Sequence, residues 1–145
     1  EDAKDVFGIA AENTDIEGGK LDKNGYISVA KQLTDRFNFK AVAITLRGSI
    51  SASDNNWSGM LYINDQAHFA KNYLIHLVDR VGGGDSFGGG LIHAMRKWPD
   101  DPDKIIEFAV AASCLKQATE YDFNMASEAE VLGLAGGSGS GRVQR

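Results

Sequence analysis

The sequence is poor in cysteine and in basic charge, and it lacks a long apolar run. Cys114 is the single cysteine among 145 residues, so neither an intrachain disulfide nor a thiolate metal cluster can form. The formal net charge is −5, and no basic stripe is present to neutralise the phosphates of a nucleic acid. No apolar stretch approaches the ~20 residues of a membrane span. We therefore expect a protein of the reducing cytoplasm, with neither a nucleic acid nor a membrane as its partner.

Two further absences concern the start of the chain and its histidines. The chain opens with "EDAKDVFGI", without a methionine and already with the pattern of a helix, so we expect it to be part of a longer protein. No signal peptide opens the sequence. The three histidines, at positions 68, 76 and 93, show no metal-ligand spacing. What is present, 43% hydrophobic and 24% charged residues, is typical of one globular domain, which we place at residues 1–135. The Gly- and Ser-rich residues 136–145 are expected to form a flexible tail.

The order of predicted elements is that of an α/β fold. Hydrophobic spacing predicts helices over residues 1–9, 24–37 and 84–97, a helix capped by Asp101 and Pro102, and a last one from the capping box of Ser127 and Glu130 to Gly136. Apolar runs predict strands over 40–46, 58–63, 67–71 and 73–79, with a polar loop over 47–57 and a turn at Asn64-Asp65. The strand at 40–46 is continuously apolar, as in the centre of a parallel sheet. About four strands are fewer than the roughly five to six of an average sheet, so further strands are expected in a missing N-terminal part.

Residues 81–90 read "VGGGDSFGGG" and lie between a predicted strand and a predicted helix. Glycines at such a junction let a loop and a helix N-terminus direct unpaired N–H groups at one point, where a phosphate can bind. The spacing matches neither the P-loop nor the dinucleotide fingerprint. A carboxylate beside the anion would repel it, unless the carboxylate takes a proton from the group that attacks the phosphate. Asp85 is therefore a candidate base for phosphoryl transfer, with Gly82, Gly83 and Gly84 as the anion cradle.

A structural interpretation of the same residues stays open at this point. An aspartate in the first turn of a helix interacts favourably with the helix dipole, by ~0.3–1 kcal/mol, and the glycines can simply turn the chain. Spacing alone does not decide between the two. For Trp57, packing on the residues of its own loop is a simpler interpretation than covering a base. Structural roles are also the simpler interpretation for His93 and for Cys114, a small core residue. Glycines 88–90 suggest that another backbone or a ligand packs closely there.

The stretch "DRVGGGDSFGGGLI" resembles the second signature of the ribokinase-like (PfkB-type) carbohydrate kinases, which reads Asp-Thr-x-Gly-Ala-Gly-Asp-Ser/Thr-Phe. The match covers Asp79, Gly82, Gly84, Asp85, Ser86 and Phe87. It departs at Arg80, where a small or β-branched residue is usual, and at Gly83, which is usually Ala. The stretches "VAITLRGSISASDNNWSGMLY" and "IEFAVAASCLKQATEYDFNMAS" are similar to the sugar-acid branch, the 2-keto-3-deoxygluconate kinases, although Tyr121 replaces a common Gly.

The resemblance implies both a fold and an activity. The fold is the C-terminal part of a three-layer α/β/α domain, with a central, mostly parallel sheet flanked by helices. The activity is ATP-dependent phosphorylation of a sugar-acid hydroxyl, from 2-keto-3-deoxygluconate to its 6-phosphate. By this resemblance Asp85 is the catalytic base and residues 82–84 form the anion hole. The residues that would border the nucleotide are Thr45, Arg47, Gly48 and Ser49.

The resemblance also implies ligands and partners. ATP would bind with Mg²⁺, and Asp2 stands near the end of a stretch similar to the family's magnesium-holding Asn-x-x-Glu. Some relatives hold a monovalent cation beside the position of Asp79. The partners would be a sugar acid, the N-terminal half of the same protein and, through an exposed sheet edge, a second copy. Three alternatives stay open: an inactive fragment, a non-catalytic nucleotide- or phosphate-binding domain, and a kinase for fructose, ribose or a nucleoside.

Overall fold

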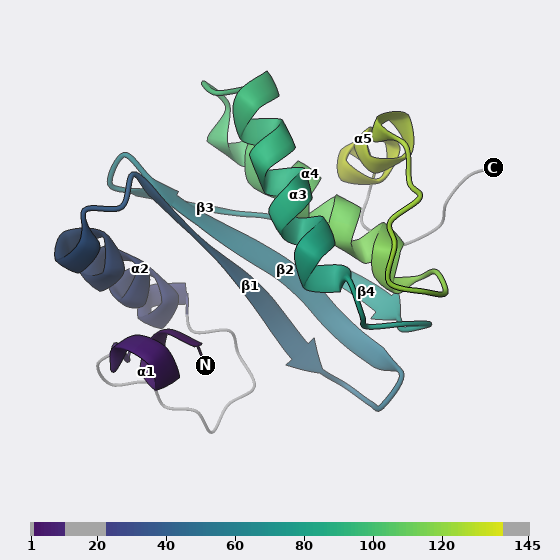
Figure 1. Cartoon of the computed structure of the whole chain (residues 1–145), viewed down its shortest axis with the longest axis horizontal. Coiled ribbons are helices and arrows are strands. Elements are labelled where there is room, and N and C mark those ends of the chain that lie inside the picture. The colour runs from purple at the N-terminus through teal and green to yellow at the C-terminus, as the bar shows by residue number, and fades with distance from the viewer. Residues whose placement is uncertain (1, 11–22, 138–145) are drawn as a thin grey trace.

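The computed structural model describes residues 2–10 and 23–137, and its centre is a four-stranded sheet (Figure 1). The helices are α1 (Asp2–Phe7), α2 (Lys23–Phe37), α3 (Gly83–Lys97), α4 (Pro102–Gln117) and α5 (Glu128–Gly136). The strands are β1 (Ala41–Ser49), β2 (Asp54–Ile63), β3 (Gln66–Phe69) and β4 (Tyr73–His76). The expected flexible tail falls almost entirely on residues 138–145, which lie outside the described part of the chain. None of the helices in the described part is long and apolar enough to cross a membrane.

The helix boundaries follow local signals in the sequence. Asp101 caps α4 by accepting a hydrogen bond from the Lys104 backbone N–H, and Pro102 occupies the first turn. Ser127 and Glu130 form the predicted capping box at the start of α5. These contacts confirm the predicted helix starts.

The sheet differs from the prediction in the direction of its strands. All pairs between described strands are antiparallel: β2 pairs with β1 along one edge, and with β3 and then β4 along the other. The connections explain this, because residues 50–53 join β1 to β2 and Asn64 with Asp65 joins β2 to β3. Parallel neighbours need a crossover of about a dozen residues or more. The expected mostly parallel arrangement is therefore wrong for these strands.

The predicted polar loop over 47–57 is also wrong, because most of it is strand. β1 continues to Ser49 and β2 begins at Asp54, so only residues 50–53 turn. Trp57 lies in β2 between Arg47 of β1 and Tyr73 of β4, and its side chain is buried. Pairing on both sides satisfies the backbone of this polar stretch, which the apolar pattern alone does not reveal. The turn at Asn64 and Asp65 is confirmed, and both residues have positive φ.

Helices cover both faces of the sheet (Figure 1). Side chains of β2 alternate: Met60 and Tyr62 join the core beneath α2, whereas Trp57 and Leu61 join the core beneath α3 and α4. Gly59 allows α4 to lie close to the strand, because a Cβ there would come within 2.8 Å of Val110 Cγ2. This arrangement confirms the expected α/β class with three layers.

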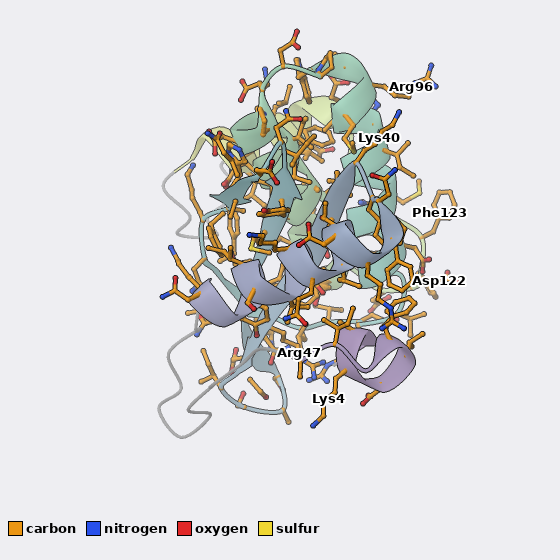
Figure 2. All side chains as sticks on the ribbon, turned by 90° about the vertical axis from the view of Figure 1, so that its left-hand side faces the viewer. Lys4, Lys40, Arg47, Arg96, Asp122 and Phe123 are labelled. Atoms are coloured by element: carbon orange, nitrogen blue, oxygen red, sulfur yellow. The ribbon has the colours of Figure 1, made fainter. Side chains whose placement is uncertain are left out.

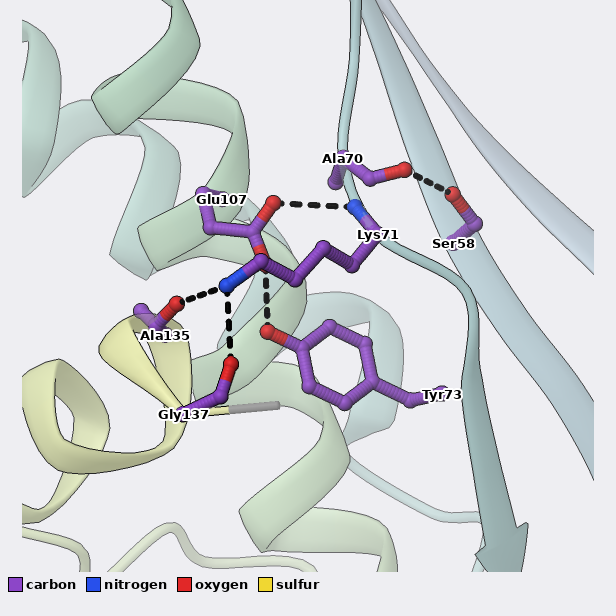
Figure 3. A network of polar contacts seen from close by, with 7 residues as sticks. All are labelled: Ser58, Ala70, Lys71, Tyr73, Glu107, Ala135 and Gly137. Carbon is purple, nitrogen blue, oxygen red and sulfur yellow. Dashed lines mark hydrogen bonds and ion pairs between the residues drawn. The ribbon is translucent and has the colours of Figure 1, made fainter. Parts of the chain in front are cut away.

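Lys71 and Glu107 fasten the sheet to α4 and α5 (Figure 3). The Glu107 carboxylate accepts hydrogen bonds from the Lys71 backbone N–H, at 2.9 Å, and from the Tyr73 hydroxyl. Burial raises the pKa of Tyr73 far above its usual value, so the hydroxyl stays a donor. The Lys71 ammonium donates to the carbonyls of Ala135, at 2.6 Å, and Gly137, at 2.9 Å. It therefore caps the C-terminal end of α5.

Candidate functional site

The candidate site is built around the loop that leads from β4 into α3. Asp79 organises its start, because its carboxylate accepts the backbone N–H of Val81 at 2.9 Å. Gly82 is the N-cap of α3 and has a φ of 77°, in the left-handed region that favours glycine. A Cβ at Gly82 would also lie 1.9 Å from the Asp122 carbonyl oxygen. Both the backbone conformation and the close approach of Asp122 therefore require glycine here.

The C-terminal end of α4 supports this loop from below. The Ser113 hydroxyl donates to the Gly83 carbonyl at 2.8 Å, and the Gln117 side chain lies against Gly83. The Gln117 carbonyl accepts the backbone N–H groups of Val78 and Asp79. Ser113 and Gln117 are buried and hydrogen-bonded to each other. The sequence interpretation missed these two residues, although polar side chains four residues apart in an apolar helix signal one polar stripe.

The N-terminus of α3 leaves backbone donors available. The Gly83 N–H donates to the Arg80 carbonyl at 3.2 Å, and the Ser86 N–H donates to the Gly82 carbonyl at 2.9 Å. Within the described residues, the N–H groups of Gly84 and Asp85 have no hydrogen-bond partner. Unpaired N–H groups at a helix start carry positive partial charge and can bind an anion. These two free N–H groups lie at the end of the predicted cradle, but the Gly83 N–H is already used within the loop, so the role of Gly82, Gly83 and Gly84 as an anion hole stays a prediction.

Asp85 stands in the first turn of α3 beside these donors. Its side chain is exposed, and it forms no hydrogen bond or ion pair with any other described residue. The neighbouring Gly84 is open, because nothing lies within 4 Å of the position that its Cβ would take. An unpaired carboxylate beside an anion cradle can accept a proton from an incoming hydroxyl.

A groove of about 320 Å³ runs along α3 from this point. Its α3 wall carries Ser86, Gly89, Gly90 and His93. The opposite wall comes from Phe108 and Ala112 of α4 and from Asn124, Ala126, Glu128 and Val131. A Cβ at Gly90 would lie 3.1 Å from the Ala112 Cβ, so close helix packing explains that glycine, whereas Gly89 faces open space. The Cβ at Gly90 would also lie 3.3 Å from the Ala109 Cα, so the expectation that another backbone or a ligand packs closely on these glycines is met at Gly90 by the backbone of α4.

His93 lies at the far end of the groove in a cluster of charges. Its ring nitrogen Nε2 lies 2.9 Å from a Glu128 carboxylate oxygen, and the Lys97 ammonium donates to the other oxygen. The hydrogen bond from Lys97, and then that from His93, holds the pKa of Glu128 below its usual value. The ring of His93 packs on Phe108. This geometry agrees with a structural role for His93.

The predicted nucleotide-border residues lie on β1, at the end of the strand nearest residues 50–53. Alternation places Thr45, Arg47 and Ser49 on the sheet face that α3 and α4 cover, and Gly48 on the other face. Arg47 is exposed (Figure 2). The Arg80 guanidinium donates to the Ala52 carbonyl at 3.2 Å, which ties the glycine loop to this end of β1. No hydrogen bond among the described residues joins the four border residues to Asp85 or to residues 82–84, so their role stays a prediction.

The described residues give no metal centre. They contain no group of three His, Cys, Asp or Glu side chains that could hold a metal ion. Asp2 is the first residue of α1, and its side chain lies outside the described part, so its role with magnesium stays a prediction. The predicted monovalent cation beside Asp79 meets an obstacle: the ammonium of Lys116 already contacts the Asp79 carbonyl, at 3.4 Å. A second cation there would be repelled, so these residues do not fit that ion.

No family model and no curated protein matches the chain. The crystal structure of 2-dehydro-3-deoxygluconokinase from Thermotoga maritima matches 94% of this chain with 46% identity and a TM-score of 0.84. A PfkB family carbohydrate kinase from Listeria grayi matches 94% with 30% identity and a TM-score of 0.77. A third structure, from Enterococcus faecalis, is 19% identical with a TM-score of 0.78 and shows the fold alone.

The matches cover a minor share of the relatives. The chain spans 39% of the Thermotoga maritima and Listeria grayi proteins and 40% of the Enterococcus faecalis protein. Its similarity in both sequence and fold to part of such enzymes confirms the resemblance predicted from the glycine loop.

Proposed function

We propose that this chain, which is similar in sequence and fold to part of the PfkB-type carbohydrate kinases, is the catalytic part of a sugar-acid kinase. The reaction would transfer the terminal phosphoryl group of ATP to the 6-hydroxyl of 2-keto-3-deoxygluconate. The observation that carries this proposal is the unpaired Asp85 carboxylate beside the free backbone N–H groups at the start of α3. The similarity to the Thermotoga maritima protein, a 2-dehydro-3-deoxygluconokinase, supports the substrate class.

The residues of this chain supply two parts of the chemistry. The Asp85 carboxylate accepts the proton of the sugar hydroxyl while that oxygen bonds to the γ-phosphorus and the bond from phosphorus to the ADP oxygen breaks. The N–H groups of Gly84 and Asp85, with the dipole of α3, stabilise the negative charge on the transferred group. Ser113 and Gln117 hold the loop in place during this step.

The groove along α3 is the proposed place for the rest of the nucleotide. The groove begins at Ser86, directly after Asp85, and continues to His93. A nucleotide whose phosphate binds at the start of α3 would therefore place its remaining part in the groove. Thr45, Arg47, Gly48 and Ser49 remain the proposed border of the nucleotide on the sheet side. Magnesium would accompany ATP and reduce the negative charge of its phosphates, with Asp2 as the proposed ligand from this chain.

One observation favours a second function, that of a binding module: the chain covers 39% of the length of its Thermotoga maritima and Listeria grayi relatives. The proposed cradle and the proposed base both lie in this part, so the chain alone would serve as a nucleotide- or phosphate-binding module without turnover. The proposed kinase would need the remaining part of the protein to bring the sugar hydroxyl to Asp85.

A coupled assay of ATP consumption in the full-length protein separates these functions. We expect consumption that depends on 2-keto-3-deoxygluconate and is much weaker with fructose, ribose or a nucleoside. Consumption driven instead by one of those three substrates would overturn the substrate class. ATP binding without consumption on any sugar would favour the binding module. In this chain alone, without the remaining part, we expect binding and no turnover.

A further inference from the structure

Lys116 is a buried lysine without a carboxylate partner. It lies in the last turn of α4, and its side chain is 0% exposed. Its ammonium contacts two main-chain carbonyl oxygens, those of Asp79 at 3.4 Å and Thr119 at 3.5 Å. Among the described residues, no carboxylate comes within ion-pair distance of it. Removing an unpaired charge from water costs several kcal/mol, so this arrangement needs a compensating gain.

The position of Lys116 indicates what the charge stabilises. Asp79 begins the glycine loop, and Thr119 begins the segment that leads to Asp122, whose carbonyl lies against Gly82. The ammonium therefore joins the two segments that meet at the N-cap of α3. The C-terminal end of α4 adds its negative partial charge, which favours a cation there. The Thr119 hydroxyl and backbone N–H both donate to the Lys116 carbonyl and hold the turn after the helix.

Main-chain carbonyl oxygens are also the ligands with which proteins hold potassium. The lysine ammonium is a compact point charge with three donors, and it can replace such an ion where two or three carbonyls converge. A tethered cation differs from a free one, because it is always present and does not depend on the salt concentration.

We propose that Lys116 is a built-in substitute for a monovalent cation, and that it positions the glycine loop without any bound potassium. It acts through the backbone of Asp79 and is thus a positioning residue, since it contacts no reacting atom. Its role in turnover rests on the proposed kinase function, whereas its role in holding the loop does not.

The test compares the full-length wild type with K116M, which keeps an apolar stem and loses the ammonium. Thermal unfolding is followed in potassium, sodium or tetramethylammonium chloride at one ionic strength. The wild type should have the same midpoint in all three salts. K116M should unfold ~2–8 °C lower in tetramethylammonium, and potassium should restore at least half of the loss, more than sodium does. K104M, which removes a lysine from the first turn of α4, should show no difference between the salts.

Two results would overturn the proposal. One is selective stabilisation or activation of the wild type by potassium, which would show that a free cation still binds. The other is a folded K116M, or a folded K116Q, that potassium stabilises no more than tetramethylammonium does. If K116M fails to fold in every salt, the proposal is tested by the salt dependence of the wild type and by the effect of potassium on the stability of K116Q. Absence of kinase turnover in the wild type would refute the proposed function and leave the stability test intact.

Under the same salts, turnover gives a second readout. Wild-type turnover should not change when potassium replaces tetramethylammonium. K116M should lose turnover in tetramethylammonium and regain part of it in potassium. Loss without regain, in a protein that potassium does stabilise, would contradict the positioning role.

Discussion

At the scale of single residues, the structure leaves no room for a side chain at Gly82 but does leave room for one at Gly84. Gly82 combines a φ of 77° with a carbonyl oxygen 1.9 Å from the position of a Cβ, whereas nothing lies within 4 Å of a Cβ at Gly84. We expect G82A to lower the free energy of unfolding by ~2 kcal/mol or more, because the left-handed conformation alone costs ~1–2 kcal/mol. G84A should keep full stability. Urea unfolding of both variants measures the difference.

The same pair also tests the cradle. G84A adds a methyl group beside the proposed phosphate, so it should weaken ATP binding although the fold is unchanged. A G82A variant as stable as the wild type would contradict the loop geometry. A stable G84A with unchanged ATP affinity would contradict the position of the cradle.

Cys114 gives a prediction on pH. Burial raises the pKa of its thiol well above the ordinary 9.0. The unfolded thiol ionises first, so its contribution to stability is complete below pH 9 and is lost as the pH rises toward the folded value. The difference in free energy of unfolding between wild type and C114A should therefore fall by ~1 kcal/mol per pH unit above that point. A constant difference between neutral and alkaline pH would mean that the thiol is accessible in the folded protein.

At the scale of elements, α3 presents a glycine to the groove and another glycine away from it. Nothing lies within 4 Å of a Cβ at Gly88 or Gly89, but only Gly89 lines the groove. A leucine at either position gains up to ~1 kcal/mol of helix propensity. G89L should nevertheless raise the Kd for ATP by ~10-fold or more, a loss of ~1.4 kcal/mol, because its side chain fills the groove.

G88L is the matched control for this effect, and calorimetric titration of ATP into the full-length variants measures it. Equal affinities for the two variants would exclude the groove as the nucleotide site.

The elements also show how far the sequence predicts the fold. Helix starts were predictable because Asp101 and Ser127 act on backbone groups within the next turn. The extent of β2 is not predictable in this way. Asn55 and Trp57 are held in the strand by pairing to β1 and β4, and the local sequence pattern carries no information on such pairing. Gly82 and Asp85 stand out in the sequence because of a short motif, and their roles in binding and catalysis stay predictions. Ser113, Lys116 and Gln117 were missed, because their role depends on a loop distant in the sequence.

At the scale of the whole molecule, the sheet formed by the described strands has two unpaired edges, β1 on one side and β3 with β4 on the other. Among the described strands, β1 pairs only with β2, although Val42 and Leu46 are buried beneath α2. An apolar strand with a free edge accepts another strand. We expect a strand from the rest of the full-length protein to pair with the free edge of β1. The direction of that additional strand does not follow from the sequence of this chain.

An exposed apolar segment lies near the groove at this larger scale. Tyr121, Phe123 and Met125 are 76%, 71% and 82% exposed, and Figure 2 shows Phe123 projecting outward beside Asp122. The Asp122 carbonyl packs on Gly82, so this segment borders the cradle. Asn124 and Ala126 of the same segment line the groove.

The central claim is that Asp85 accepts the proton of the hydroxyl that attacks the phosphate. The most direct measurement is the turnover number of the full-length D85N variant in the coupled assay, beside D100N, which changes an exposed acid in the turn before α4. The account predicts a fall of ~10²–10⁴ in kcat for D85N, with ATP affinity and folding retained and D100N unchanged. Turnover of a folded D85N within a fewfold of the wild type would contradict the account.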